Sequence, residues 1–268
     1  MSYIRVAEKA AREAGAHLLR ELKREKEYEY KYKNSMVTEV DISSEDLIID
    51  IIQTKYPLHS IIAEERGELE NDSSFRWIID PIDGTTNYLH RYPFFSVSIG
   101  LEIDGVISAG VVYNPMRDEL FTAEIGKGAY MNGSPIKPSR INTIEESLLT
   151  TGFTHKEGWM VDEGIFHLEK FIYRAQGFRR DGSAALDLSY VAMGRVDGFW
   201  EIGLHCWDVA AGSLILTEAG GAISDFSDAE YDIYGIELLA TNGLIHDEMI
   251  EVLLLGRELR GVKEGYKK

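Results

Sequence analysis

The chain has 268 residues, 44% of them hydrophobic, and 28 basic against 45 acidic residues leave a formal charge of −17. This length suits one large domain or two subdomains in close contact. The negative charge repels nucleic acid and anionic membranes, so neither is expected as the main ligand. The single cysteine, Cys206, excludes an internal disulfide and agrees with the cytoplasmic location that we expect. The charged N-terminus is not a signal peptide, and no apolar run approaches the roughly 18 residues that span a membrane.

Helical patterns occupy the beginning of the chain. Apolar residues at helical spacing predict an amphipathic helix over residues 3–27, and residues 28–37 lack periodicity and are expected to be irregular. Ser43 or Ser44 is expected to cap a second helix over LIIDIIQTKY, which ends before Pro57.

Strands follow, and further on strands alternate with helices. A strand is predicted over 75–79, and the runs FFSVSIGLEI, GVISAGVVYN and ELFTAEIG predict an antiparallel meander. Later helices are predicted at 161–174, AALDLSYVAMG, VAAGSLILTEAG and IHDEMIEVLLLG, and strands at LLTTGF, 177–180, DGFWEI and ELLATNG. This order predicts an α+β fold with an N-terminal subdomain, 1–140, and a C-terminal α/β subdomain, 141–268.

The stretch WIIDPIDGTTNYLH places two carboxylates, Asp80 and Asp83, after an apolar run. A buried carboxylate is costly unless it is paired or coordinates a metal, although Asp-Pro and Asp-Gly are also common in plain turns. Gly84 and Thr85 could cradle a phosphate with backbone N–H groups at a helix N-terminus. The carboxylates would repel that phosphate unless Mg²⁺ lay between them. Asp80, Asp83 and the Ile82 carbonyl offer the oxygen ligands that Mg²⁺ prefers.

Two further acidic positions are candidates, each with a simpler alternative. Glu64 and Glu65 follow a strand-like apolar run, where a solvated surface pair is the alternative. Asp208, in HCWDVAAG, starts a predicted helix, where the alternative is an N-cap role. We interpret His205 and Cys206 as packing residues, because no second His or Cys stands at the spacing of zinc ligands.

Together these segments resemble the two signature motifs of the inositol monophosphatase family, a group of Mg²⁺-dependent, lithium-sensitive sugar phosphatases. The matching stretches are Asp80-Pro-Ile-Asp83-Gly-Thr85-Thr86-Asn and Trp207-Asp208-Val-Ala-Ala-Gly, and further ones are VTEVD ending at Asp41, IAEE, GSAA and EIGLHCWD. The resemblance covers nearly the whole chain. It implies a layered αβαβα sandwich of the inositol monophosphatase and fructose-1,6-bisphosphatase type, a homodimer, and two or three Mg²⁺ ions at each active site.

The resemblance also implies residue roles. The metal ligands would be Glu64, Asp80, the Ile82 carbonyl, Asp83 and Asp208, with Asp83 bridging two metals. The catalytic residues would be Glu64, Asp41 and Thr85, of which Asp41 and Thr85 position and activate the attacking water. The substrate-binding residues would be Asp83, Gly84, Thr85, Ala184 and Glu201, the last two contacting inositol hydroxyls. Two metals about 3.5–4 Å apart can stabilise both the attacking and the leaving oxygen of a phosphate ester.

The expected function is Mg²⁺-dependent hydrolysis of a small-molecule phosphate monoester, with myo-inositol monophosphate as the leading substrate. Fructose 1,6-bisphosphate is the main alternative, since Arg179 and Arg180 could bind its second phosphate. Histidinol phosphate and 3′-phosphoadenosine 5′-phosphate rank lower, and a regulatory binding protein that kept the fold is the non-enzymatic alternative. The stretch Ser35-Met36-Val37-Thr38 lacks the acidic residue of the family's Asp-Leu-Val-Thr, so an ancillary metal position and lithium sensitivity do not follow.

Overall fold

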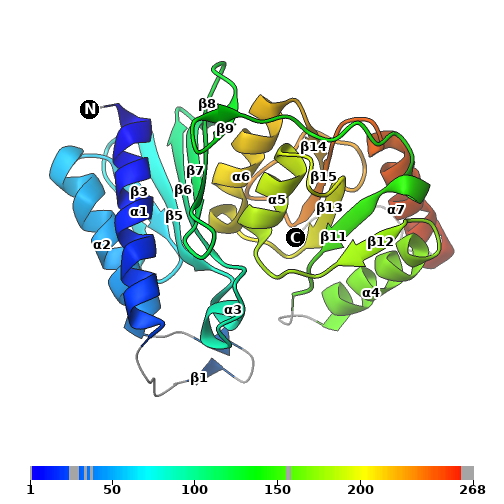
Figure 1. Ribbon diagram of the computed structural model, residues 1–268, viewed down its shortest axis with the longest axis horizontal. Coiled ribbons are helices and arrows are strands. Elements are labelled where there is room, and N and C mark those ends of the chain that lie inside the picture. Colours follow the sequence, from blue (N-terminus) through cyan, green and yellow to red (C-terminus); the bar gives the residue numbers. More distant parts are fainter. Residues whose placement is uncertain (1, 24–29, 33–34, 37–38, 155–157, 261–268) are drawn as a thin grey trace.

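The computed structural model describes residues 2–23, 30–32, 35–36, 39–154 and 158–260. Figure 1 shows five layers in the order helices, sheet, helices, sheet, helices. Helices α1 and α2 cover the outer face of the first sheet, α5 and α6 lie between the sheets, and α4 and α7 cover the outer face of the second. The predicted αβαβα sandwich is confirmed.

The helices have the bounds α1 (Tyr3–Glu21), α2 (Glu39–Lys55), α3 (Thr85–Leu89), α4 (Gly158–Ile172), α5 (Ala184–Ala192), α6 (Cys206–Ala219) and α7 (His246–Arg260). The first sheet has the strand order β10-β9-β8-β7-β6-β5-β3-β4. Its strands are β3 (Ser60–Ala63), β4 (Gly67–Leu69), β5 (Phe75–Asp83), β6 (Ser96–Ile103), β7 (Val106–Asn114), β8 (Glu119–Glu124), β9 (Ala129–Met131) and β10 (Ser134–Pro135). The second sheet, ordered β12-β11-β13-β15-β14, contains β11 (Leu148–Thr151), β12 (Gly177–Arg179), β13 (Gly198–Ile202), β14 (Ala222–Ser224) and β15 (Glu237–Thr241).

Strands β6, β7 and β8 form the antiparallel meander predicted from the sequence. Strand β5 pairs antiparallel with β6 and parallel with β3, so the first sheet is mixed. This arrangement places the ends of β3 and β5 side by side, with Ala63 opposite Ile79. Glu64, which follows β3, is therefore brought to the same end of the sheet as Asp80 and Asp83, which lie in the last part of β5.

Helix α6 is packed closely onto the first sheet at two glycines. Gly100 of β6 and Gly110 of β7 are paired in register, and α6 lies directly over them. A Cβ at Gly110 would come 2.8 Å from the Ala211 carbonyl, and one at Gly100 would come 3.0 Å from the Ala210 Cβ. Because no larger side chain fits here, the N-terminus of α6, with Asp208, is held against the end of β5.

Several predicted boundaries differ from the structure. Helix α2 begins at Glu39 rather than after Ser43 or Ser44, since Glu39 and Asp41 stabilise its first turn and both serines lie inside the helix. Helix α1 ends at Glu21, and residues 24–27 of its predicted extent lie outside the described part.

Strand pairing also extends beyond the predictions. Part of the stretch expected to be irregular forms a short antiparallel pair, β1 (Tyr30–Tyr32) with β2 (Ser35–Met36). Val37 lies outside the described residues. The strand predicted over 75–79 continues to Asp83, because Asp80 and Asp83 still pair with β6.

Residues 136–143 connect the two sheets along one side of the molecule in Figure 1. The core does not divide there: one cluster of buried side chains joins Phe121 of the first sheet, Val209 of α6 and Phe199 of the second sheet. The subdomain boundary near residue 140 stays a prediction. No helix in the described part of the chain is long and apolar enough to cross a membrane.

Candidate active site

Asp80 and Asp83 lie in the last four residues of strand β5, and both side chains are buried. Asp80 lies opposite Ser98 and Asp83 opposite Ser96, with a shift in register between the two pairs. Asp80 Oδ1 accepts a hydrogen bond from the Ile82 N–H at 2.9 Å. The irregular strand end therefore turns both carboxylates to one side, and the Asp-Gly hairpin considered as an alternative does not form.

Asp208 completes a cluster of three carboxylates. One carboxylate oxygen from each of Asp80, Asp83 and Asp208 lies within 4.8 Å of the others. Asp208 is not the N-cap of α6, as the simpler alternative had it. His205 is the N-cap, and its backbone N–H donates to Asp208 Oδ2 at 2.7 Å across the first turn. This capping box fixes the Asp208 side chain at the sheet end of the helix.

The electrostatics of the cluster favour a bound cation. Burial raises the pKa of Asp80 well above its usual range, and the nearby Glu64, Asp83 and Asp208 add to the shift. Burial also raises the pKa of Asp83 to about 6, against the effect of its hydrogen-bond donors. Hard carboxylate oxygens that repel one another are the donors that suit Mg²⁺, which would relieve the repulsion. The residues present therefore fit the metal that the sequence implies.

Glu64 follows β3 directly and lies at the rim of this cluster. Its backbone N–H donates to the Ile79 carbonyl at 3.2 Å, and its carboxyl group interacts with that of Asp80. Limited solvation raises the pKa of Glu64 to about 8, helped by Asp208, Glu65 and Asp41. The side chain nevertheless keeps an exposed surface, so water screens part of the repulsion.

The carboxylate of Asp83 joins the first sheet to α5. It accepts hydrogen bonds from the backbone N–H groups of Ala184 at 3.2 Å and Ala185 at 2.9 Å, and from the hydroxyl groups of Ser183 and Ser96. These donors favour its ionised form. The sequence predictions gave a role to Ala184 but to neither serine. Ser183 stands in the quoted stretch GSAA, directly before a helical pattern, which is a recognisable N-cap signal.

Thr85 and Asp41 meet beside the cluster. Thr85 Oγ1 lies 3.2 Å from Asp41 Oδ1 and 3.1 Å from the Ile82 carbonyl oxygen. Asp41 is buried on α2. Gly84 adopts a left-handed conformation with φ of 97°, and a Cβ there would lie 2.9 Å from the Gly182 carbonyl oxygen. A side chain at position 84 would thus disturb the contact between the two halves of the site.

Ala184 and Glu201 lie on the side of the site formed by α5 and the second sheet. The Glu201 carboxylate, on β13, covers Gly152, where a Cβ would come 1.9 Å from Oε2. Burial raises the pKa of Glu201 to about 8; Arg180 opposes the shift, and Asp208 and Asp83 add to it. Arg179 and Arg180 are both exposed.

Three residues that were given no role at the site in the sequence predictions support it. Asn87 Nδ2 donates to the carbonyl groups of Phe94 at 2.6 Å and Asp181 at 2.7 Å, which links α3 to the loop before α5. Ser44 and Glu45 of α2 also bond to segments of the site. Ser44 and Glu45 stand three and four residues after Asp41 and so lie on the same helix face, which is the feature of the sequence that could have indicated their role at the site. Thr38 lies outside the described residues, and the roles given to the other residues stay predictions.

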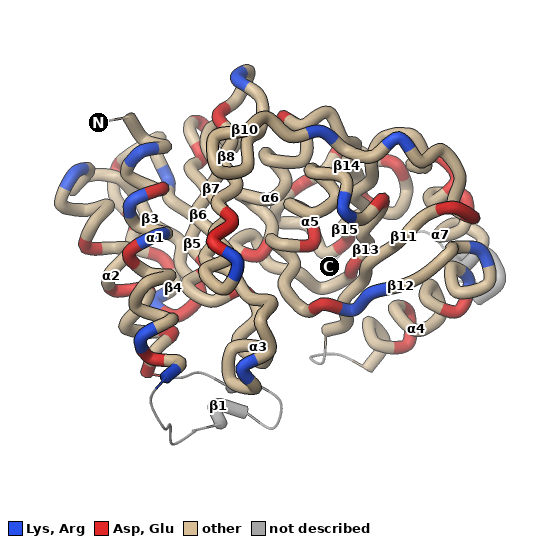
Figure 2. Tube along the Cα trace, viewed as in Figure 1, with Lys and Arg blue, Asp and Glu red and all other residues tan. Residues whose placement is uncertain are grey.

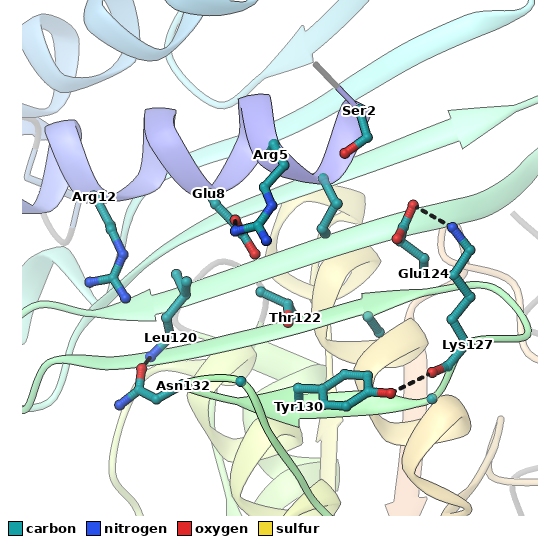
Figure 3. A pocket seen from close by; sticks show the side chains of 14 residues that line it. Ser2, Arg5, Glu8, Arg12, Leu120, Thr122, Glu124, Lys127, Tyr130 and Asn132 are labelled. Carbon is teal, nitrogen blue, oxygen red and sulfur yellow. Dashed lines mark hydrogen bonds and ion pairs between the residues drawn. The ribbon is translucent and has the colours of Figure 1, made fainter.

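A separate cavity of about 560 Å³ lies between α1 and the β8–β9 hairpin (Figure 3). Its charged side chains are already paired: Arg5 with Glu8 and Lys127 with Glu124, each at 3.0 Å, and Arg12 with Asp118 outside the cavity lining. None of the predicted site residues lines it. In the view of Figure 2, basic residues are spread along the described chain rather than gathered in one stripe. Neither feature competes with the carboxylate cluster as the chemical centre.

Comparison with known proteins identifies the family. The model of the inositol monophosphatase family matches residues 1–254. The inositol-1-monophosphatase of Synechocystis sp. is 42% identical over 254 residues, which are 94% of this chain and 88% of that protein. Nus factor SuhB of Escherichia coli K12 is 47% identical over 227 residues, 84% of this chain and 85% of that protein. The solved inositol monophosphatase of Anabaena (Nostoc) sp. PCC 7120 aligns with a TM-score of 0.86 at 44% identity, covering 94% of this chain and 95% of the other. The chain belongs to the inositol monophosphatase family and has its fold.

Proposed function

We propose that this protein is a Mg²⁺-dependent phosphate monoester hydrolase and that inositol 1-phosphate is its preferred substrate. The observation that carries the proposal is the cluster of Asp80, Asp83 and Asp208, whose oxygens lie within 4.8 Å of one another. Glu64 and the Ile82 carbonyl complete the proposed set of metal ligands. Bound Mg²⁺ would neutralise the phosphate charge and lower the pKa of a water molecule.

The residues around the cluster have distinct tasks in this reaction. The Thr85 hydroxyl lies 3.2 Å from Asp41 Oδ1, so it can take a proton from the attacking water while its own proton passes to Asp41, which leaves Thr85 neutral. Glu64 helps to hold the same water. The backbone at Gly84 and Thr85 binds the phosphate, and Ala184 and Glu201 orient the inositol ring.

Phosphate release from inositol 1-phosphate and from fructose 1,6-bisphosphate, each with Mg²⁺ and with a chelator, tests this proposal. Release that depends on Mg²⁺ and is faster from inositol 1-phosphate is expected. Release from neither substrate under any metal condition would contradict the proposed activity. A preference for the bisphosphate would contradict only the proposed substrate.

A second function is favoured by the SuhB relatives, whose name describes a Nus factor and so a partner of the transcription machinery. In this reading the chain acts through a protein surface, as the non-enzymatic alternative from the sequence also holds. The two functions separate in one variant: Asp83→Asn should abolish phosphate release and leave binding to purified transcription complexes unchanged. Failure of the wild type to bind those complexes would remove this candidate. A homodimer and a cytoplasmic location stay predictions.

A further inference from the structure

One face of α2 contacts three separate segments of the candidate site. Asp41, Ser44 and Glu45 follow one another at helical spacing and are all buried. Asp41 bonds to Thr85, as described above. Ser44 Oγ lies 3.4 Å from the Pro81 carbonyl oxygen, between Asp80 and Asp83. Glu45 reaches the loop that carries Glu64, the least buried of the proposed ligands.

Glu45 holds this loop through both of its carboxylate oxygens. Oε2 accepts from the Glu65 N–H at 2.9 Å, and Oε1 accepts from the Arg66 N–H at 2.8 Å. On the other side of the loop, the Glu64 N–H is bonded to Ile79 of β5 at 3.2 Å. The backbone is therefore fixed immediately before and immediately after the Glu64 side chain. Burial raises the pKa of Glu45, whereas the two N–H groups favour its ionised form.

We propose that Glu45 is a positioning residue for the metal site: its bidentate bond to the backbone after Glu64 holds Glu64 in reach of a cation bound by Asp80 and Asp208. This inference rests on the proposed metal-dependent function. Residues that orient metal ligands without touching the metal typically change metal affinity or activity by about 10–100-fold when they are mutated.

The neighbouring Asp46 supplies a matched control. Its carboxylate bonds to the side chain of Arg66, with Nη2 to Oδ1 at 2.6 Å and Nη2 to Oδ2 at 2.7 Å, on the exposed surface of the same loop. Asp46→Asn therefore removes a charge beside the loop and leaves both backbone bonds to Glu45 in place. Glu45→Gln keeps the size of the side chain but retains only one oxygen for the two N–H groups.

The test is a Mg²⁺ titration of chelator-treated wild type, Glu45→Gln and Asp46→Asn, followed by tryptophan fluorescence, since Trp207 adjoins Asp208. The expected dissociation constant is raised about 10–100-fold in Glu45→Gln and stays within about twofold of wild type in Asp46→Asn. Phosphate release should show the same shift in Mg²⁺ dependence, with KM for the substrate unchanged at saturating Mg²⁺. A purely structural role would instead lower the Tm in chelator without changing the dissociation constant.

An unchanged Mg²⁺ dissociation constant in folded Glu45→Gln would overturn the proposal, as would an equal rise in Asp46→Asn. If Glu45→Gln does not fold, Glu45→Asp decides by the same criterion, because it keeps the carboxylate but shortens its reach. Binding is measured apart from catalysis. A wild type that binds Mg²⁺ and releases no phosphate would therefore refute the proposed function and leave this comparison valid.

Discussion

The two ends of the candidate site are built differently. At the metal end, the carboxylates are held by backbone N–H groups and by hydroxyl groups from several elements: Asp83 alone accepts from Ala184, Ala185, Ser183 and Ser96. At the substrate end, Glu201 lies over Gly152 with Arg180 nearby. The side chain of Arg180 is exposed to solvent.

This difference has a physical consequence. A group fixed by many bonds from rigid elements keeps its geometry when neighbouring side chains change, so the metal end is determined by the fold itself. The substrate end depends on single side chains, one of which is an exposed arginine. We therefore expect the reaction type to tolerate sequence change better than the choice of substrate does.

The largest effect is expected at the metal end, from Asp83→Asn. The substitution removes a charge and a proposed metal ligand with little change in volume, and the asparagine oxygen can still accept from the N-terminus of α5. The rate of phosphate release at saturating Mg²⁺ should fall by at least about 100-fold. Steady-state kinetics measures this, with exposed Asp72→Asn as the charge control and circular dichroism to confirm the fold. Near-full turnover would break the assignment of Asp83.

Mg²⁺ itself should stabilise the protein through the same end of the site. Binding relieves the repulsion among Asp80, Asp83 and Asp208, and a ligand at 100 times its Kd adds about 2.7 kcal/mol to the free energy of unfolding. For a chain of this size the Tm should rise by roughly 5–10 °C relative to chelator. Thermal unfolding across a Mg²⁺ series measures the shift, which should be smaller in Asp83→Asn. A Tm that does not depend on Mg²⁺ would argue against a preformed metal site.

The metal-free protein should become less stable as the pH rises. The pKa of Asp83 is raised to about 6 and that of Glu64 to about 8, so between about pH 4 and pH 8 the folded state binds more protons than the unfolded state. The contribution of these two groups to the free energy of unfolding then falls across this window, and bound Mg²⁺ should flatten the slope because it takes the place of the protons. Urea unfolding at pH 5 and pH 8, with chelator and with Mg²⁺, tests this. A metal-free protein more stable at pH 8 would contradict the repulsion inferred here.

Sequence reasoning reached the metal end because its residues stand in contiguous motifs. Asp80 and Asp83 lie three residues apart after an apolar run, and the layers followed from the strand and helix patterns together with the family resemblance. The start of α2 was missed because Ser43 and Ser44 carried a local capping signal, whereas Ser44 bonds to Pro81 and Ser43 to Val40 within the helix. A local signal cannot show that a side chain has a tertiary partner.

The supporting residues were missed for the same reason. Glu45 bonds to backbone groups 20 and 21 residues away, and its only signal in the sequence is its position four residues after Asp41, which does not reveal that partner. Asp208 was considered as an N-cap because the sequence pattern does not show that the helix begins earlier, with His205 as its N-cap. Glu201 of β13 meets Gly152, the residue directly after β11, only because these two strands are paired in the second sheet.

The smallest and most specific effect is expected at the substrate end, from the charge of Glu201. Because burial raises the pKa of Glu201 to about 8, the ionised fraction of Glu201 grows between pH 7 and pH 9. An ionised carboxylate accepts hydrogen bonds from inositol hydroxyls more strongly than a protonated one, and it repels the second phosphate of fructose 1,6-bisphosphate. The ratio of kcat/KM for inositol 1-phosphate over the bisphosphate should therefore rise between pH 7 and pH 9, by up to about tenfold for an effect of 1.4 kcal/mol. The glutamine of the Glu201→Gln variant cannot ionise, so the ratio for this variant should stay constant with pH and lie below that of the wild type at pH 9.

The ratio cancels steps common to both substrates, including any titration of Glu64. A flat wild-type ratio, or a Gln variant that follows the wild type, would remove Glu201 as the discriminating group, and Arg180 would then be the residue to test.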